Sequence, residues 1–555
     1  MLLKYVVGLM ETLSKNIGNH LYYHIAFAFL PALGILLTVA YQHLINRDHI
    51  EKGIGKIIIN IKKNRSNIKV NNLYSQIITS SLTIGFGGSA GLEAPIVCIG
   101  SAIGSNSGKV FNLSPYEKTV LIAAGASAGL AAVFNSPIAG VLFSLEILIG
   151  EITIPTFIPL LIASATGVVV SKLLYSGQLF HLVTGGWVLD ALPFYVILGL
   201  FSGWISVYIS KMAGILEKGI LKNYNRYTRA IAGGLLLGVM IMVFPALFGE
   251  GYTHLQEILN GNISALRNET YFAHWLLQPL VMIVFIACLV FMKIIAAGIT
   301  LGSGGNGGTF APTMFTGAFL GLFVAFTANQ TGLVHLNVSN FIAVGMAGAL
   351  CGVMHAPLTA IFLIAEITGG YVLFIPLMIV VSISYVISRI YNPYNMYWKE
   401  LIHEQNIRPD QDYTMLDAIP LDSIINRNFT TLKKDTLISE FYAVLSKSNA
   451  NIFAVLDNDG ELEGVILMDQ VRKQLFNQKP ADATVQEIMT APPTIIDYNQ
   501  PVSDVMEVFD ALDVWQLPVV NNGVFMGFIS KSTLLTQYRE EIIKQHRETD
   551  LFAHL

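Results

Sequence analysis

The chain is poor in charged residues, which make up only 13% of its 555 amino acids. An average soluble domain carries about 25%. The formal net charge is −4, so the composition excludes the strongly basic surface of a nucleic-acid-binding protein, and we expect no nucleic-acid partner. With 53% hydrophobic residues and a mean hydropathy of +0.58, the composition is instead typical of a membrane protein.

Cysteine is scarce as well. The three cysteines, Cys98, Cys288 and Cys351, all lie in apolar stretches. Such isolated cysteines behave as small core residues, so the pattern argues against a disulfide framework and against a cysteine-ligated metal site. We expect neither an enzyme with catalytic residues nor a resident metal.

Long uninterrupted apolar runs are missing from a region that is otherwise apolar, from about residue 20 to about residue 392. The first run, roughly residues 21–45, predicts a membrane helix. Later runs are cut by Gly, Pro and Ser, as in GFGGSAGLEAP, FNSPIAG, LGSGGNGGTFAP and MHAPLTA. Broken helices are tolerated at membrane depth where they are buried in protein or line a cavity. We therefore predict a multi-span, all-α membrane domain whose broken helices mark a transport route.

The membrane region also repeats itself. Residues 125–147 match residues 345–367 at a shift of 220, and GLEAP (91–95) matches GTFAP (308–312) at a shift of 217. Two matches at nearly one offset indicate a duplication. Duplicated halves of membrane proteins are often inverted and hold their substrate between them on discontinuous helices.

Composition changes along the chain and predicts its domains. The membrane domain is predicted over residues 1–398, with repeat one at about 20–215 and repeat two at about 228–392. A polar junction follows at 399–416, and the tail from 417 to 555 carries frequent charges and short apolar runs.

Four prolines at the breaks predict helix starts inside or near the membrane. They are Pro95, Pro137, Pro312 and Pro357, each after a small or polar turn and before an apolar run. A helix N-terminus carries about half a positive charge and several N–H groups without helical partners. Several such ends that converge would bind an anion without a full positive charge, so that the anion could also leave.

Glu93 lies within GLEAP, between small residues and a proline. If this segment leads into a helix start that binds anions, an ionised Glu93 would occupy the place of the anion, and a protonated Glu93 would leave it. Acids inside membranes are costly and indicate function by default. We therefore predict that Glu93 gates the route and carries a proton.

The tail contains a second repeat, at about residues 421–478 and 484–541. Each copy has an extended stretch, an amphipathic helix, a strand, a turn and a second strand that enters a helix. The layout resembles a tandem pair of CBS modules, which are small α/β domains that pack in pairs. The fold predicted for the whole chain is thus a helical membrane domain of two inverted repeats followed by an α/β tandem CBS domain.

The membrane motifs resemble those of the CLC chloride channels and chloride/proton antiporters. GLEAP is similar to the family motif G-[KR]-E-G-P, with Glu93 in the gating position and Gly91, Leu92 and Ala94 beside the anion. GGTFAP (307–312) is similar to G-x-F-x-P, in which the backbone N–H groups hold the anion; the resemblance assigns that role to Thr309 and Phe310.

Two more assignments come from the same resemblance. NMYWKEL (395–401) matches the segment that supplies an anion-contacting tyrosine, here Tyr397. EKGIGK (51–56) is the nearest match to the motif G-S-G-I-P, so that Lys52 replaces the serine. If Lys52 points inward, it would change anion selectivity or retention. The alternative is that it points to cytoplasmic water.

The resemblance implies chloride transport by a homodimer in the cell membrane, in contact with lipid and with protons as a second partner. The CBS pair is then cytoplasmic. Proton-coupled members usually carry an internal glutamate where this chain has Ile147, which leaves Glu146 and Glu151 as nearby acids and leaves channel and exchanger both open. Leu92 replaces the usual Lys or Arg, which should weaken the attraction of anions near the mouth.

Many CBS modules sense adenine nucleotides through a hydroxyl and an Asp after their last strand. The second module keeps the hydroxyl as Ser530 but has Thr533 in place of the Asp, and the first module has Leu467 in place of the hydroxyl. An adenine nucleotide is therefore only a weak expectation, with Ser530 as its contact, and no other cofactor is expected.

Two alternatives remain open. The first is a fluoride/proton antiporter of the same family; Tyr397 argues against it, because that branch generally lacks this tyrosine, whereas Lys52 leaves it open. The second is a CBS-regulated divalent-cation transporter, which would need several inward carboxylates as hard ligands. The membrane region offers few acids, and its helix starts favour an anion.

Overall fold

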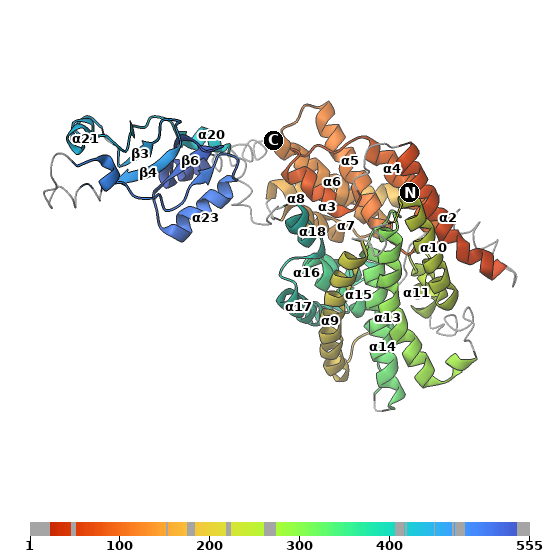
Figure 1. The fold of residues 1–555 in the computed structure, drawn as a ribbon. Coiled ribbons are helices and arrows are strands. Elements are labelled where there is room, and N and C mark those ends of the chain that lie inside the picture. Colours follow the sequence, from red (N-terminus) through yellow and green to blue (C-terminus); the bar gives the residue numbers. More distant parts are fainter. Residues whose placement is uncertain are drawn as a thin grey trace. The chain divides into compact units, whose positions relative to one another are not determined.

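The computed structural model describes residues 23–45, 52–150, 154–174, 184–217, 224–259, 274–332, 334–405, 416, 419–448, 450–468, 471 and 483–540. The chain divides into two compact units, Met1–Asn406 and Ile407–Leu555. Figure 1 shows the first as a bundle of helices and the second as strands flanked by helices.

The membrane unit begins with the helices of its first half. These are α2 (Tyr23–Leu44), α3 (Ile54–Lys62), α4 (Asn71–Gly85), α5 (Glu93–Val110), α6 (Pro115–Phe134), α7 (Pro137–Phe143), the π-helical turn η1 (Ser144–Ile149) and α8 (Ile154–Leu174). A helix, α2, thus forms where the first membrane helix is predicted, and its segment Ala28–Leu44 belongs to the shorter apolar helices of the described residues.

The remaining helices of the membrane unit follow. They are the 3-10 turn η2 (Leu189–Ala191), α9 (Leu192–Glu217), α10 (Arg226–Val243), η3 (Pro245–Leu247), α11 (Tyr252–Leu259), η4 (Trp275–Leu277), α13 (Pro279–Gly302), α14 (Phe310–Gln330), α15 (Val338–Met354), α16 (Pro357–Ile367), α17 (Phe374–Tyr391) and α18 (Met396–Gln405). Among the described residues, seven helical segments are long and apolar enough to cross a membrane, and the shorter apolar helices include α15 and α16.

Both halves pair their helices through glycine. On α5, a methyl group added to Gly104 would lie 2.0 Å from the Leu121 carbonyl oxygen of α6. On α14, a methyl group added to Gly321 would lie 2.0 Å from the Phe341 carbonyl oxygen of α15. Only glycine permits so close an approach of two helix backbones, which is how helices associate where no water drives them together. The same contact made twice supports the duplication.

The prolines mark helix starts, as predicted. Pro137 and Pro357 are the first residues of α7 and α16, while Pro95 and Pro312 lie in the first turns of α5 and α14. Pro is tolerated there because the first N–H groups of a helix have no helical acceptor.

The helices before α7 and α16 end in the same way. Asn135 (φ 58°) and His355 (φ 54°), which are related by the shift of 220, both adopt the left-handed conformation that terminates α6 and α15. The equivalence of the repeats therefore extends to backbone conformation.

The predicted repeat boundaries stay predictions. Helix α9, which they place in the first repeat, packs on α13, α15 and α17 of the second half. The junction predicted to start at 399 is still helical, because α18 continues to Gln405. The composition of α18 is polar enough to be typical of a linker, so composition alone does not predict this helix.

The second unit holds two small sheets. One has the order β1-β7-β6-β5 and the other β2-β3-β4, and in each a parallel pair is extended by an antiparallel hairpin. The strands are β1 (Ile425–Asn426), β2 (Thr431–Leu432), β3 (Ile452–Leu456), β4 (Leu462–Leu467), β5 (Ile496–Asp497), β6 (Gln516–Asn521) and β7 (Val524–Ser530). The helical elements are α20 (Leu421–Ile424), α21 (Ile438–Leu445), α23 (Val502–Leu512) and the 3-10 turn η5 (Val485–Glu487). This is the predicted tandem α/β arrangement.

The hairpin turns of this unit follow from their sequences. The turn between β6 and β7 places Asn522 and Gly523 at φ 49° and 89°, a conformation that Asn and Gly adopt most readily. Helices α21 and α23 bury Phe441 and Phe509 against the sheets. Apolar burial on one face of each helix therefore holds each module together.

Candidate functional site

The two motif glycines of the membrane unit pair with each other. Gly91 donates to the Gly308 carbonyl oxygen and Gly308 donates to the Gly91 carbonyl oxygen, both at 2.8 Å, as an isolated antiparallel bridge. These glycines are equivalent in the repeat. Their reciprocal pairing, expected of halves related by a two-fold axis, brings the starts of α5 and α14 together.

Glu93 is the first residue of α5, and its side chain is 1% exposed. The Tyr252 hydroxyl donates to Glu93 Oε1 at 2.5 Å. A methyl group added to Gly91 would lie 2.1 Å from Glu93 Oε2 and 3.1 Å from the Ala311 backbone nitrogen. The carboxylate therefore lies beside the first turn of α14, where N–H groups point out of the helix.

The neighbours of Glu93 in GLEAP behave differently from one another. The N–H of Gly91 is taken by Gly308, and the N–H of Leu92 donates to Glu250 Oε1 at 2.9 Å. The Leu92 side chain is buried in an apolar cluster. In this structure protein acceptors hold the first two predicted anion-binding N–H groups, while Ala94 lines a cavity next to the bridge.

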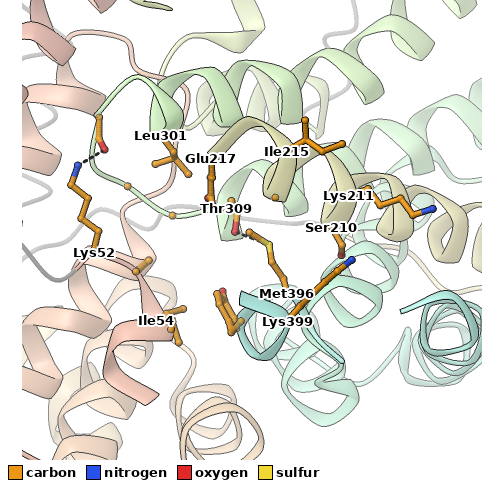
Figure 2. Close-up of a pocket in the computed structure, with 18 residues that line it drawn as sticks. Lys52, Ile54, Ser210, Lys211, Ile215, Glu217, Leu301, Thr309, Met396 and Lys399 are labelled. Atoms are coloured by element: carbon orange, nitrogen blue, oxygen red, sulfur yellow. Dashed lines mark hydrogen bonds between the residues drawn. The ribbon is translucent and has the colours of Figure 1, made fainter. Parts of the chain in front are cut away.

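That cavity has a volume of about 560 Å³. Four of the predicted site residues line it: Lys52, Ala94, Thr309 and Tyr397. Figure 2 shows Lys52 on one side and Lys211 and Lys399 on the other, with Thr309 and Met396 between them. Although Glu217 adds one negative charge, three lysines give the lining a net positive charge, which attracts anions.

Thr309 and Phe310 form the start of α14. Thr309 is the N-cap residue and Phe310 the first helical residue, so their N–H groups precede the first helical hydrogen bond, from the Thr313 N–H to the Thr309 carbonyl oxygen. The Thr309 hydroxyl donates to Met396 Sδ at 3.7 Å. The Phe310 ring packs on Phe134, with centroids 5.6 Å apart, which fixes the helix start from the side.

Tyr397 lies in the first turn of α18 and is 8% exposed. It lines the cavity together with Thr309. The structure thus brings the predicted tyrosine to the start of α14, although 87 residues separate the two in sequence. This is the arrangement that a shared anion site would need.

Lys52 lines the cavity, and burial, with a smaller effect of the Arg229 charge, lowers the pKa of its ammonium group to about 7. Its Nζ donates to the carbonyl oxygens of Gly304 at 2.9 Å and Gly305 at 3.0 Å, at the rim of the cavity. The lysine therefore anchors the loop that leads into GGTFAP and lies beside the cavity. The partners are about 250 residues away, so sequence could not reveal them.

The helix starts at Pro137 and Pro357 are already occupied by carboxylates. Glu366 accepts from the N–H groups of Ile138 (3.0 Å) and Ala139 (2.9 Å) at the start of α7. Glu146 accepts from the N–H groups of Leu358 (3.0 Å) and Thr359 (2.8 Å) at the start of α16. Each acid comes from the opposite half.

This reciprocal capping corrects the expectation that several of the four helix starts converge on an anion. Only those of α5 and α14 meet at the bridge, because a carboxylate already satisfies the other two. Glu146 also accepts from the Thr359 hydroxyl at 2.6 Å, so it acts as a helix cap. Ile147 is buried, and Glu151 lies outside the described residues.

Three polar residues near Glu93 were missed in the sequence. Glu250 and Tyr252 come from FGEGY (248–252), and Lys293 lies on α13 with its side chain fully buried. Lys293 Nζ donates to the carbonyl oxygens of Leu247 (3.3 Å) and Gly249 (2.9 Å). The available signal was a charged residue within an apolar stretch, the same signal that identified Glu93. Lys293 thus anchors, with a cationic side chain, the segment that carries Glu250 and Tyr252.

Ser530 ends β7 in the second unit. Its hydroxyl lies 2.7 Å from the Thr533 hydroxyl and accepts from the Thr533 N–H at 3.1 Å. Thr533, which stands where nucleotide-sensing modules have Asp, therefore forms local hydrogen bonds with the Ser530 hydroxyl that a nucleotide would contact. This leaves Ser530 as the single residue predicted to contact a nucleotide.

Family models match both units. A model described as voltage gated chloride channel matches residues 33–389, and a model described as CBS domain matches residues 421–477 and 485–540.

Relatives match over most of the chain or over its membrane unit. Chloride channel protein CLC-f of Arabidopsis thaliana is 24% identical over 85% of this chain and 69% of its own. A putative chloride channel protein, ClcB-like, of Ralstonia nicotianae is 30% identical over 59% of this chain and 74% of its own.

Solved structures share the fold. A eukaryotic CLC transporter matches with a TM-score of 0.59 and 18% identity over 96% of this chain and 94% of its own. A slow cyanobacterial Cl−/H+ antiporter matches with a TM-score of 0.59 and 21% identity, over 73% of this chain and 95% of its own. A CLC-type fluoride/proton antiporter matches with a TM-score of 0.54 and 24% identity, over 71% and 95%.

Proposed function

The chain belongs to the voltage gated chloride channel (CLC) family, and on that premise we propose that it carries chloride across a membrane along a route gated by Glu93. The observation that carries the proposal is the buried Glu93 carboxylate at the paired starts of α5 and α14. An anion and this carboxylate would use the same donors, so only one of them can be there at a time.

The gate follows from hydrogen bonding and charge. While Glu93 is ionised, the Tyr252 hydroxyl and the nearby start of α14 favour its place at the bridge. A proton on Glu93 removes the negative charge and with it most of this attraction. The side chain can then leave its place to chloride, which arrives from the positively charged cavity next to the bridge.

The test uses the full-length protein in chloride-loaded liposomes, with chloride efflux and proton movement recorded together. We expect Glu93→Ala to keep chloride flux and to abolish both its pH dependence and any proton coupling. An unchanged pH profile would contradict the role of Glu93.

Glu257→Ala is the matched control. Glu257 is an exposed acid on α11, the helix that also carries Tyr252, whereas Glu93 is buried. We expect this variant to keep the pH profile of the unmodified protein. A change in the control equal to that of Glu93→Ala would show that any lost acid has this effect.

Chloride is the proposed anion rather than fluoride. Tyr397 lines the cavity beside Thr309 and can donate its hydroxyl to an anion at the start of α14. Parallel efflux assays in chloride-loaded and fluoride-loaded liposomes separate the two substrates. Fluoride efflux that exceeds chloride efflux would favour the fluoride/proton antiporter.

Uncoupled or weakly coupled flow is favoured over tight exchange with protons. Ile147 cannot bind a proton, and Glu146 is engaged by three donors at the start of α16. A proton entering from that side would have to break this cap. Proton uptake in fixed ratio to chloride efflux in the liposome assay would overturn this assignment.

We also propose a homodimer in the cell membrane, with the CBS pair on the cytoplasmic side. Ile138 and Leu358, equivalent residues of α7 and α16, are apolar and about 40% exposed in the single chain. Exposed apolar side chains of this kind are expected where a second subunit covers the surface. Mass measurement in detergent tests the dimer.

Adenine nucleotide binding at Ser530 is tested by calorimetry on the full chain, with Ser530→Ala as the comparison.

A further inference from the structure

The segment from Leu247, at the end of η3, to Tyr252, the first residue of α11, is packed against the gate. Its residue Glu250 contacts the start of α5 through the Leu92 N–H, and its residue Tyr252 contacts Glu93. No function assigned above uses Glu250. A second carboxylate at this helix start raises the question of what it does to the first.

Glu250 holds the donor that precedes Glu93. Leu92 is the N-cap of α5, and its N–H donates to Glu250 Oε1 at 2.9 Å. Glu250 is half-buried and Glu93 is buried, so water screens their charges only partly. Glu250 binds the N–H of the residue before Glu93, so the two carboxylates meet at the start of α5 and repel each other when both are ionised, and a proton on Glu93 relieves that repulsion.

Tyr252 acts in the opposite sense. Its hydroxyl donates to Glu93 Oε1 at 2.5 Å, and a donor of this kind stabilises the ionised form of a carboxyl group. The acid and the hydroxyl reach the gate from positions only two residues apart. One short segment thus applies two opposing effects to the same carboxyl group.

Other ionisable groups complete this neighbourhood. Lys293 of α13 anchors the segment through the carbonyl oxygens of Leu247 and Gly249, and its Nζ lies 4.9 Å from the centre of the Phe315 ring. Tyr397 of α18 lies within electrostatic range of Glu93. Both stay constant when Glu250 or Tyr252 is replaced, so the opposing effects can be measured separately.

We propose that Glu250 and Tyr252 are positioning residues that set the pH at which Glu93 opens the route. Glu250 favours opening at a higher pH by its negative charge, and Tyr252 favours opening at a lower pH by its hydrogen bond. The proposal rests on the gating role proposed for Glu93, through which both residues act.

The test measures chloride efflux from liposomes against pH for the full-length protein and its variants. Glu250→Gln keeps an oxygen that can accept from the Leu92 N–H but removes the charge, so we expect the midpoint of the pH profile to move to lower pH. Tyr252→Phe removes the hydrogen bond, so we expect the midpoint to move to higher pH. Each shift should be about half to one pH unit, which corresponds to a three- to tenfold change in proton affinity.

A double variant separates this proposal from the proposed function. Glu93→Ala should have no pH dependence, and adding Glu250→Gln to it should change nothing further. If Glu93→Ala keeps the original pH profile, the gating role fails. If Glu93→Ala is flat but Glu250→Gln moves the midpoint to higher pH or not at all, the gating role stands and the present proposal is wrong.

Glu257→Gln on α11 is the matched control for charge. Its side chain is exposed, so the same loss of one negative charge should leave the midpoint unchanged. Thermal unfolding of each variant in detergent shows whether it is folded. A shift of equal size and sign in the control would overturn the assignment, because it would reflect the overall charge.

Discussion

The broken helices of the membrane unit form two pairs. The starts of α7 and α16 each hold a carboxylate from the opposite half, with two backbone N–H groups on each acid. The starts of α5 and α14 meet at the Gly91–Gly308 bridge, where Glu93 and Glu250 belong to a neighbourhood that also contains Lys293 and a positively charged cavity.

We expect the two pairs to differ in whether the acid can leave. Glu146 and Glu366 bind two adjacent donors each, and release of either acid would leave the N–H of a buried residue, Thr359 or Ala139, without its partner. Glu93 is held at one oxygen by a tyrosine hydroxyl, next to a cavity that an anion can enter. The same physical device, a carboxylate at a helix start, caps helices in one pair and is the proposed gate in the other.

The largest effect should come from breaking the first pair. Glu146→Ala removes an acceptor of three hydrogen bonds, and we expect it to lower the free energy of unfolding by about 2 to 4 kcal/mol. Glu366→Ala removes an acceptor of two and should cost less. Thermal unfolding in detergent measures both. A pH profile of flux lost in Glu146→Ala, with stability intact, would contradict the division into two pairs.

The glycine contacts test whether both halves depend on close helix packing. Gly321→Ala would place its methyl group 2.0 Å from a backbone oxygen of α15, and we expect a loss of about 1 to 3 kcal/mol. Gly214→Ala on α9 meets nothing within 4 Å and should be neutral or stabilising by about 1 kcal/mol or less. Equal losses at Gly321 and Gly214 would show that the contact does not matter.

Lys52 is a cation at the rim of the cavity at pH values below its lowered pKa of about 7. At such a pH, Lys52→Met should reduce chloride flux about threefold to tenfold at low ionic strength, because the cavity loses a cation at its rim. Salt screens such attraction, so the difference should shrink as ionic strength rises. Efflux assays at two salt concentrations check this. A deficit that is independent of salt would indicate that the lysine acts only by anchoring Gly304 and Gly305.

The smallest effect on the free energy of unfolding is expected in the CBS unit, where an exposed acid pairs with a lysine and not with a helix start. Asp510 pairs with Lys531 at 2.8 Å on the surface, with the Asp510 side chain 59% exposed. Asp510→Ala should change the free energy of unfolding by less than about 1 kcal/mol, because water competes with an exposed pair. Chemical denaturation of the full chain measures this. A loss as large as that of Glu146→Ala would remove the contrast between buried caps and surface pairs.

Much of the site could be predicted because its signals are local. Proline before an apolar run predicts a helix start, so the positions of α5, α7, α14 and α16 follow from a few residues each. Glu93 could be identified because a carboxylate in an apolar segment is costly. Glu250 and Lys293 carry the same signal but lie outside the motifs GLEAP and GGTFAP, so their place beside the gate could not be predicted.

The partners of the helix starts could not be predicted, since they come from distant parts of the chain. The shift of 220 relates Glu146 to Glu366, but it does not say that each caps the helix of the other half. The same holds for Lys52, whose acceptors at Gly304 and Gly305 lie about 250 residues away. Which acid lies at which helix start depends on how the halves cross.

The amino-acid sequence by itself determined that this is a membrane protein of two repeats with interrupted helices and a tandem CBS tail. Hydropathy, proline and glycine act within a turn or two of the backbone and need no distant partner. Only the tertiary structure decided which helix starts are capped and which face the cavity. That outcome depends on hydrogen bonds between the halves, and these form only when the halves pack together.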